Sequence, residues 1–470
     1  MRVITRRVVV LLSALALAVT EFAPALAAQP AEPVTLNLAF TQPVRTLDPG
    51  QLSPFAYDYD ARDLVENLFV GLMAHDPQTN SLERGLAERW EVSDDGLRWT
   101  FFLRDDVQWV RHNPITGESY ALRPVVADDF VFAMRRVCSP ANETLHFTSV
   151  FIVDGCQIVY RTEWDFLTAD FIAERIGVRA LDERTVEYQL AFPAAYFLTF
   201  TAMPEFRPLP REYVAASPAW AEVGSVVTNG PFVVADWAHD QSITLVRNPH
   251  WPDGWTGNIE RVQVAFMPES DAVMGALSAG RLDRAPVPSG VVAPVPTQSL
   301  VHPTVVLLGF SMERGFMGER GVRQALAWSI DRAALTAQLL PGDGLPTTHL
   351  VPPGMVGGPS PGEIGKGFDP DAARAAFASA GYANCGGVPE RIEVMVSDAP
   401  LMEALARFTV EGWQRELGCN PSLFDIILAR PTTVLANARG TFSDSPGYAR
   451  PHAWIISWTA DYYDANNWLA

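Results

Sequence analysis

The stretch that decides the fold is Val322-Arg323-Gln324-Ala325-Leu326-Ala327-Trp328-Ser329-Ile330-Asp331-Arg332. Its apolar residues recur at the spacing of one helix face: Leu326 and Ile330 lie four residues apart, and Leu335 follows on the same side. The pattern predicts one amphipathic helix over Val322–Leu339. An apolar run at Val305–Leu308 precedes the helix and predicts a strand. A strand that leads into a helix is the unit from which α/β folds are built.

Strand and helix patterns continue on both sides of this stretch. Predicted strands lie at Thr35–Phe40, Trp99–Leu103, Thr185–Leu190, Phe232–Val234, Ile243–Val246, Val262–Phe266 and Ala453–Trp458. Predicted helices begin at Asp128-Asp129 and cover Ala272–Ala279, Asp371–Ala380 and Met402–Leu417. A glycine follows each of the last three helices, as expected at a helix C-terminus. The mixture predicts an α/β protein.

The chain length and the net charge limit the number of domains and the classes of partner. The chain has 470 residues, enough for roughly three units of ~150 residues. Asp and Glu number 54 against 35 Lys and Arg, so the net charge is −19. Nucleic acid and anionic lipid both require a basic surface, so neither is an expected partner.

The N-terminus has the pattern of an export signal. Arg6-Arg7 precede an apolar run from Val8 to Val19, and a small-residue site follows at Ala25-Leu26-Ala27. The run is too short to span a bilayer, which takes ~20 residues. Residues 1–27 are therefore predicted to be a cleaved signal peptide. The mature chain is expected to be a soluble, periplasmic or otherwise extracytoplasmic protein.

Four cysteines, Cys138, Cys156, Cys385 and Cys419, are expected to reach an oxidising compartment. An even number there favours disulfides. Three pairings are possible, and sequence neighbours favour Cys138 with Cys156 and Cys385 with Cys419. Four free buried thiols are the alternative. No CxxC pair or histidine at ligand spacing accompanies them, so no metal and no cofactor is predicted.

Several further segments match a known pattern in order along the chain. They are Leu47-Asp48-Pro49, Glu66–Leu72, Leu86–Gly96, Ala127-Asp128-Asp129, Gly230–Trp237, Val322–Arg332 and Trp458-Thr459-Ala460-Asp461-Tyr462. Each is a weak signal alone, but together and in order they are specific. The chain resembles the extracellular solute-binding proteins of peptide ABC importers, the oligopeptide/dipeptide-binding type of family 5. Dipeptide binders carry a carboxylate-clamping arginine where this chain has Asp398, so a strict dipeptide ligand is disfavoured.

The resemblance implies a two-lobed α/β fold of the periplasmic-binding-protein (type II) class, with an extra domain, an interlobe cleft and a hinge. Carried onto this chain, lobe I comprises residues 33–75 plus 180–300, the extra domain II residues 76–179, and lobe III residues 305–470. The family normally continues well beyond the Trp-Asp motif. On that pattern, lobe III is expected to be incomplete at its C-terminus and the chain to be a fragment or truncated product.

The resemblance also implies a function. The chain would be the exported component of an ABC importer that captures a peptide in the cleft and delivers it to a membrane permease. The peptide would add to a sheet edge, expected at strand Ile455–Thr459. The family aspartate carries over to Asp461, which would pair with the peptide's α-amino group. Trp458 would line the same pocket, and Ser457 and Thr459 complete the predicted ligand-binding set.

Other interpretations stay open at this point. Asp461 capping a turn and Trp458 lying in the core is the structural alternative. The same fold also hosts proteins for oligosaccharides, nickel chelates or haem, and fold does not fix the ligand. No G-x-S-x-G, HExxH, G-x-G-x-x-G or P-loop pattern occurs, so no enzymatic activity is predicted. Arg323 and Asp331 are expected to be ion-paired on the helix surface, and the protein is expected to be a monomer.

Overall fold

The computed structural model describes most of the chain. The described residues are 33–52, 59–76, 81–142, 147–255, 257–287, 291, 293, 295–297, 304–342, 344–353, 355, 357–360, 362–439, 450–460 and 464–469. The predicted signal peptide, residues 1–27, and the predicted ligand-binding Asp461 lie outside them. Within this described part, no helix is both long and apolar enough to cross a membrane.

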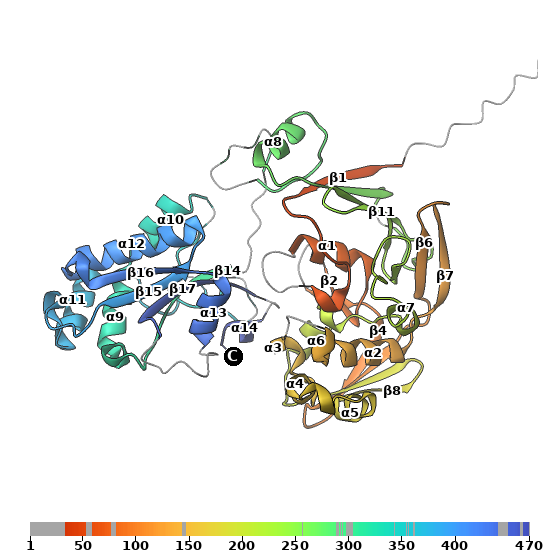
Figure 1. The fold of residues 1–470 in the computed structure, drawn as a ribbon, viewed down its shortest axis with the longest axis horizontal. Coiled ribbons are helices and arrows are strands. Elements are labelled where there is room, and N and C mark those ends of the chain that lie inside the picture. The colour runs from red at the N-terminus through yellow and green to blue at the C-terminus, as the bar shows by residue number, and fades with distance from the viewer. Residues whose placement is uncertain are drawn as a thin grey trace, which may run out of the picture.

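The described chain forms two bodies (Figure 1). The N-terminal body, residues 33–287, runs from red to green in the figure, and the C-terminal body, residues 304–469, runs from teal to blue. The N-terminal body has one large hydrophobic core with contributions from Phe40 through Phe266. The C-terminal body has a core of its own, from Phe316 through Ile455. Separate cores are what two lobes that fold as units require.

Four sheets lie in the N-terminal body. Its strands are β1 (Thr35–Phe40), β2 (Met73–His75), β3 (Leu82–Arg84), β4 (Ala87–Val92), β5 (Arg98–Leu103), β6 (Gln108–Asn113), β7 (Glu118–Pro124), β8 (Val178–Asp182), β9 (Thr185–Gln189), β10 (Val227–Thr228), β11 (Phe232–Ala238), β12 (Ser242–Arg247) and β13 (Arg261–Phe266). The sheet orders are β1-β13-β12-β11, β10-β6-β7, β4-β5-β9-β8 and β2-β3. The predicted strand Thr35–Phe40 is confirmed, and it pairs parallel with β13.

The helices of this body are α1 (Tyr59–Leu68), α2 (Ala127–Cys138), α3 (Phe147–Val150), α4 (Cys156–Arg161), α5 (Ala169–Arg175), α6 (Phe197–Phe200), α7 (Arg211–Val214) and α8 (Ser270–Ser278). α2 begins where the acidic pair predicts a helix. Asp129 is buried there and accepts bonds from the Val126 N–H at 3.0 Å and from the Trp109 indole N–H at 2.8 Å. Arg123 pairs with the same carboxylate at 2.7 Å. The acidic residue therefore caps the helix and joins it to strands β6 and β7.

The sheet β4-β5-β9-β8 bears on the predicted division into domains. β8 and β9 are paired with each other, and β9 pairs with β5. A boundary between residues 179 and 180 would run through β8. A boundary after Gln189 would keep the sheet whole within domain II, so we propose that lobe I resumes there.

The C-terminal body is built on one mixed sheet. Its strands are β14 (Thr304–Phe310), β15 (Ile392–Ser397), β16 (Phe424–Ala429) and β17 (Ala453–Thr459), in the order β14-β17-β15-β16. Its helices are α9 (Arg320–Trp328), α10 (Arg332–Leu339), α11 (Pro370–Ser379), α12 (Pro400–Leu417), α13 (Pro431–Arg439) and α14 (Asn466–Leu469). Buried residues of α9, α11 and α12 share one core with β15 and β17.

The single helix predicted over Val322–Leu339 is wrong, because two helices occupy this stretch. α9 ends at Trp328, and Asp331 caps α10 by accepting a bond from the Ala334 N–H at 2.9 Å. An aspartate at this position competes for backbone N–H groups and starts a new helix. The expected ion pairs are also wrong within the described residues, since the Arg323 guanidinium donates to the Met317 and Gly318 carbonyl oxygens.

Both predicted disulfides are confirmed. Cys138 is bonded to Cys156, with the Cα atoms 5.1 Å apart. Cys385 is bonded to Cys419, with the Cα atoms 5.0 Å apart. The first disulfide ties the end of α2 to the start of α4, and the second ties the segment after α11 to the end of α12.

Candidate functional site

Strand β17 carries the predicted ligand-binding residues, and its pairing differs on its two sides. Along its whole length it pairs antiparallel with β14, from Thr304 opposite Thr459 to Phe310 opposite Ala453. On the other side it pairs with β15 only up to Ile455. The predicted sheet edge at Ile455–Thr459 is therefore wrong for the strand as a whole, since β17 lies inside the sheet. The predicted edge is present locally, because residues 456–459 have a neighbouring described strand on one side only.

The predicted site residues project from two faces of the sheet. Side chains alternate along a strand, so Ser457 and Thr459 share one face and Trp458 points to the other. Ser457 is exposed. The Thr459 hydroxyl lies 2.7 Å from the Thr304 hydroxyl on the neighbouring strand. The strand thus presents two hydroxyl groups on the face away from Trp458.

Trp458 is half-buried and held from two directions. Its ring packs on a small apolar cluster that includes Val305, Ala460 and Trp468. Its indole N–H donates to the Asn467 side-chain oxygen at 3.0 Å. Asn467 was not among the predicted site residues. An amide six residues after Asp461, within the short helix α14, is the sequence signal that could have pointed to it.

The segment that follows the motif also reaches the other body. Asn466 on α14 is hydrogen-bonded to the Tyr196 side chain, which precedes α6. Burial raises the pKa of Tyr196, the bond from Asn466 lowers it, and the nearby Asp464 carboxylate raises it. Figure 1 shows α14 on the side of the C-terminal body nearest α6. The residues beside Trp458 therefore form a contact between the two bodies.

An acidic residue lies beyond the end of β15. Asp398 is exposed, and its backbone N–H donates to the Ala429 carbonyl oxygen at 3.0 Å, which extends the pairing with β16. Its position follows the point at which β15 ceases to accompany β17. No cluster of three or more His, Cys, Asp or Glu side chains in the described ranges is placed to hold a metal ion.

Comparison with known proteins shows which family this architecture matches. The model of the family described as "Bacterial extracellular solute-binding proteins, family 5 Middle" matches residues 81–470. The probable deoxycholate-binding periplasmic protein YgiS of Escherichia coli is 28% identical over 435 residues, which cover 90% of this chain and 76% of that protein. The oligopeptide-binding protein OppA of Bacillus subtilis is 26% identical over 337 residues, which cover 69% of this chain and 57% of that protein.

Solved structures show the same fold. The murein tripeptide binding protein MppA of Escherichia coli superposes with a TM-score of 0.66 at 22% identity, over 93% of this chain and 82% of that one. The fold is the expected α/β, two-lobed periplasmic-binding-protein (type II) fold. Its relatives bind solutes. With the family model matching most of its length, the chain belongs to the bacterial extracellular solute-binding proteins of family 5.

Proposed function

We propose that this chain is the exported solute-binding component of an ABC importer for peptides. The peptide lies between the two bodies and extends β17 along residues 456–459. Its α-amino group meets Asp461, and its backbone N–H and C=O groups pair with those of the strand. The lobes close over the peptide, and the closed monomer delivers it to a membrane permease. The protein binds its cargo without transforming it.

The observation that carries the proposal is the half-paired end of β17. In an antiparallel pair, alternate residues direct their N–H and C=O groups away from the partner strand. Beyond Ile455 these groups have β14 on one side and no described strand on the other. An extended peptide supplies the missing partner. The OppA relative is itself named as oligopeptide-binding.

Charge near this end of the strand sets the direction of the peptide. Asp461 lies two residues beyond β17 in the sequence, and Asp398 directly follows β15. Two acidic residues at one end favour the positive amino terminus of a peptide and repel its carboxylate. The carboxylate then lies farther along the groove, which favours peptides longer than two residues.

The test uses the mature chain from Ala28 and isothermal titration with tri- to pentapeptides. Free-amine peptides should bind, and N-acetylated versions should bind at least tenfold more weakly, since a charge-assisted bond contributes ~1.5–3 kcal/mol. Asp461→Asn should remove that difference, whereas Asp398→Asn should keep it. Equal binding of free and acetylated peptides by the unmodified protein would refute the pairing with Asp461.

A second cargo class is favoured by one hollow beside the site. A cavity of about 600 Å³ is lined by Leu350, Val351 and Ile364 among others, and Val351 belongs to the apolar cluster that holds Trp458. His349 also lines it, and both its ring nitrogens are buried without a hydrogen-bond partner in the described part of the chain. An apolar wall with an unsatisfied imidazole fits an amphipathic acid, and YgiS is named as probable deoxycholate-binding.

Two measurements separate the cargo classes. Native mass spectrometry of the protein as purified identifies a retained peptide, bile acid, oligosaccharide, nickel chelate or haem by its mass. Titration with deoxycholate then measures binding directly. A bile-acid site predicts binding that His349→Leu weakens and Asp461→Asn leaves unchanged. A peptide site predicts that Asp461→Asn weakens the binding of a peptide and that His349→Leu leaves it unchanged.

A further inference from the structure

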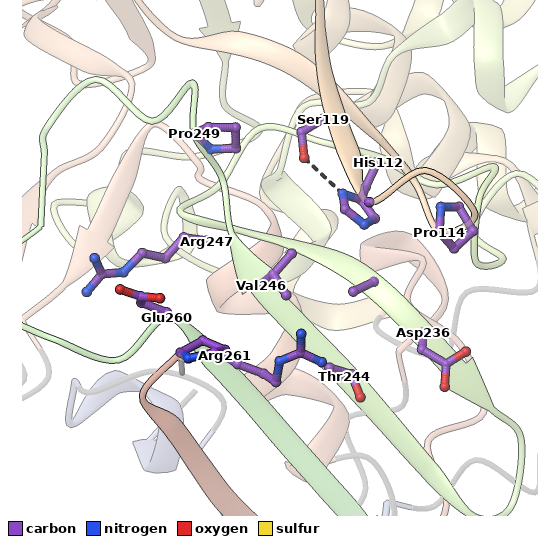
Figure 2. Close-up of a pocket in the computed structure, with 13 residues that line it drawn as sticks. His112, Pro114, Ser119, Asp236, Thr244, Val246, Arg247, Pro249, Glu260 and Arg261 are labelled. Carbon is purple, nitrogen blue, oxygen red and sulfur yellow. Dashed lines mark hydrogen bonds between the residues drawn. The ribbon is translucent and has the colours of Figure 1, made fainter. Parts of the chain in front are cut away.

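A second cavity lies entirely within the N-terminal body, away from β17. It has a volume of about 710 Å³ and lies between the β6–β7 hairpin and the sheet β11-β12-β13 (Figure 2). Cavities of roughly 300–1,000 Å³ are the usual size for small-molecule sites. All of its lining residues lie between Pro33 and Arg261, and none comes from the C-terminal body. Whatever enters it does so independently of the peptide groove.

The sheet side of the cavity is one continuous face. Arg261 on β13 lies opposite Val246 on β12, and Thr244 on β12 lies opposite Asp236 on β11. Because side chains alternate along strands, these four residues project to the same side. The residues of the other side, Ile243 and Val264 among them, belong to the main core. The cavity is therefore the outer face of the sheet, sheltered by the hairpin.

Arg261 is the unusual residue of this face. It is half-buried, and within the described residues its guanidinium has no ion pair and no hydrogen bond. Arginine is seldom removed from water unless it is paired. Its neighbour Arg247 shows the ordinary arrangement, since it donates to the Ile259 and Gly257 carbonyl oxygens and lies over the Trp255 ring. Figure 2 shows the two arginine side chains running in opposite directions.

Two carboxylates share the cavity with Arg261. Asp236 and Glu260 both line it, both are exposed, and neither forms an ion pair with Arg261 or with another described residue. A molecule that carries both signs can bridge opposite charges that line one hollow without reaching each other. A ligand carboxylate would pair with the Arg261 guanidinium in two-bond fashion, and a ligand ammonium would meet Asp236, which Figure 2 shows on the other side of Arg261 from Glu260.

The β6–β7 hairpin forms an uncharged wall of the cavity. His112 is buried, and its Nδ1 lies 2.9 Å from the Ser119 hydroxyl. Burial lowers the pKa of His112, so its ring is neutral at pH 7. Pro114 lines the same wall, and Val246 and Pro249 supply apolar surface from the sheet side. The cavity thus offers two arginines, two carboxylates and a wall with apolar surface, and only Arg261 of the two arginines lacks a hydrogen-bond or ion-pair partner among the described residues.

We propose that this cavity is a second solute site, which takes a small zwitterion with an apolar side chain, such as a free amino acid. The carboxylate pairs with Arg261, the ammonium faces Asp236, and the side chain packs on Val246, Pro114 and Pro249. Occupation of this site does not require the peptide groove.

The test is isothermal titration of the mature chain with L-leucine. 4-Methylpentanoate, which lacks the amine, and 3-methylbutylamine, which lacks the carboxylate, serve as probes of the two charges. The proposal predicts one leucine per chain, with each analogue bound about tenfold or more weakly. Arg261→Gln and Asp236→Asn should each weaken leucine binding about tenfold or more, and Arg281→Gln, an exposed arginine outside the cavity, should not.

Separate outcomes identify separate failures. Asp461→Asn should leave leucine binding unchanged, because that residue belongs to the peptide groove. Thermal melts of the variants that match the unmodified protein exclude unfolding as a cause of lost binding, and having two cavity variants keeps the test open if one of them does not fold. Absence of leucine binding at millimolar concentration, or equal binding by Arg261→Gln, overturns the proposal without touching the proposed peptide function. Loss of leucine binding in Asp461→Asn alone would assign the leucine to the peptide groove.

Discussion

Asp48 and Arg136 form a two-bond ion pair, with Oδ1 to Nη1 at 3.0 Å and Oδ2 to Nη2 at 2.6 Å. The Asp48 side chain is 2% exposed and that of Arg136 is 19% exposed. The same carboxylate accepts bonds from the Gly50 N–H and from the Trp220 indole. One side chain therefore joins the loop after β1, helix α2 and the segment before β10.

Asp48→Asn should destabilise the N-terminal body strongly. The change leaves the half-buried Arg136 charge unpaired, and breaking a buried pair in this way costs about 3–5 kcal/mol. The measurement is the free energy of unfolding from urea titration. Asp371→Asn is the matched control, because its partner Arg374 is at the surface and the Asp371 side chain is 92% exposed. Exposed pairs contribute about 0–1 kcal/mol. Equal losses for the two variants would contradict the assigned role of Asp48.

The recognisable sequence motifs are mostly structural. Asp48 of Leu-Asp-Pro and Asp129 of Ala-Asp-Asp each cap a helix and satisfy buried donors. Asn229, before the Gly-Pro motif, bonds both the N–H and the C=O of Val70. Local patterns could predict strands, helix starts and disulfides because those depend on near neighbours. The partners of Asp48 lie 88 and 172 residues away, so no local pattern names them.

Gly309→Ala should destabilise the C-terminal body. Gly309 lies opposite Trp454 on β17, and a Cβ atom at Gly309 would fall 2.0 Å from the Trp454 ring. The ring or the strand must move, and overpacking of this kind costs about 1–3 kcal/mol. Gly275→Ala in α8 is the control, since nothing lies within 4 Å of its added Cβ. Alanine there should be neutral or stabilising by up to about 1 kcal/mol. A Gly309→Ala protein as stable as the unmodified one would show that the ring relocates freely.

Acid should destabilise the protein through three buried or half-buried histidines. Burial is the largest cause that lowers the pKa of His75, His112 and His452 below the ordinary 6.5. The unfolded chain then binds protons at a higher pH than the folded chain. The contribution of these histidines to the free energy of unfolding is therefore fully present above about pH 6.5. It is lost as the pH falls from there through their lowered folded-state pKa values.

His452 is the most informative of the three. It is fully buried and accepts a bond from the Glu393 N–H, with Glu390 at 3.2 Å and Arg314 at 3.2 Å from its ring. Glu390 raises its pKa and Arg314 lowers it, but burial dominates. His452→Gln should make the free energy of unfolding less dependent on pH between about 7.5 and 5. If the His452→Gln protein keeps the original pH dependence, groups other than His452 cause that dependence.

The geometry of the candidate site was harder to predict than the fold. The motif Trp458-Thr459-Ala460-Asp461 places four residues together in sequence, but a strand sends neighbours to opposite faces. Ser457 and Thr459 consequently lie on one side and Trp458 on the other. The partner of the Trp458 indole is Asn467 on α14, nine residues farther along the chain. Register and reversal are tertiary features, which a one-dimensional motif does not contain.

Asn467→Ala tests whether Trp458 is positioned for ligand binding. The change removes the acceptor of the Trp458 indole N–H and should weaken peptide binding, since a neutral hydrogen bond contributes about 0.5–1.5 kcal/mol, equivalent to roughly 2- to 12-fold in affinity. Titration of one peptide into each variant measures it. Asn437→Ala is the control, because that amide donates to the Thr433 carbonyl oxygen within α13. A structural role alone predicts a lower melting temperature with unchanged affinity, so that result would place Trp458 in the core and leave Ser457, Thr459 and the strand backbone as the peptide-binding surface.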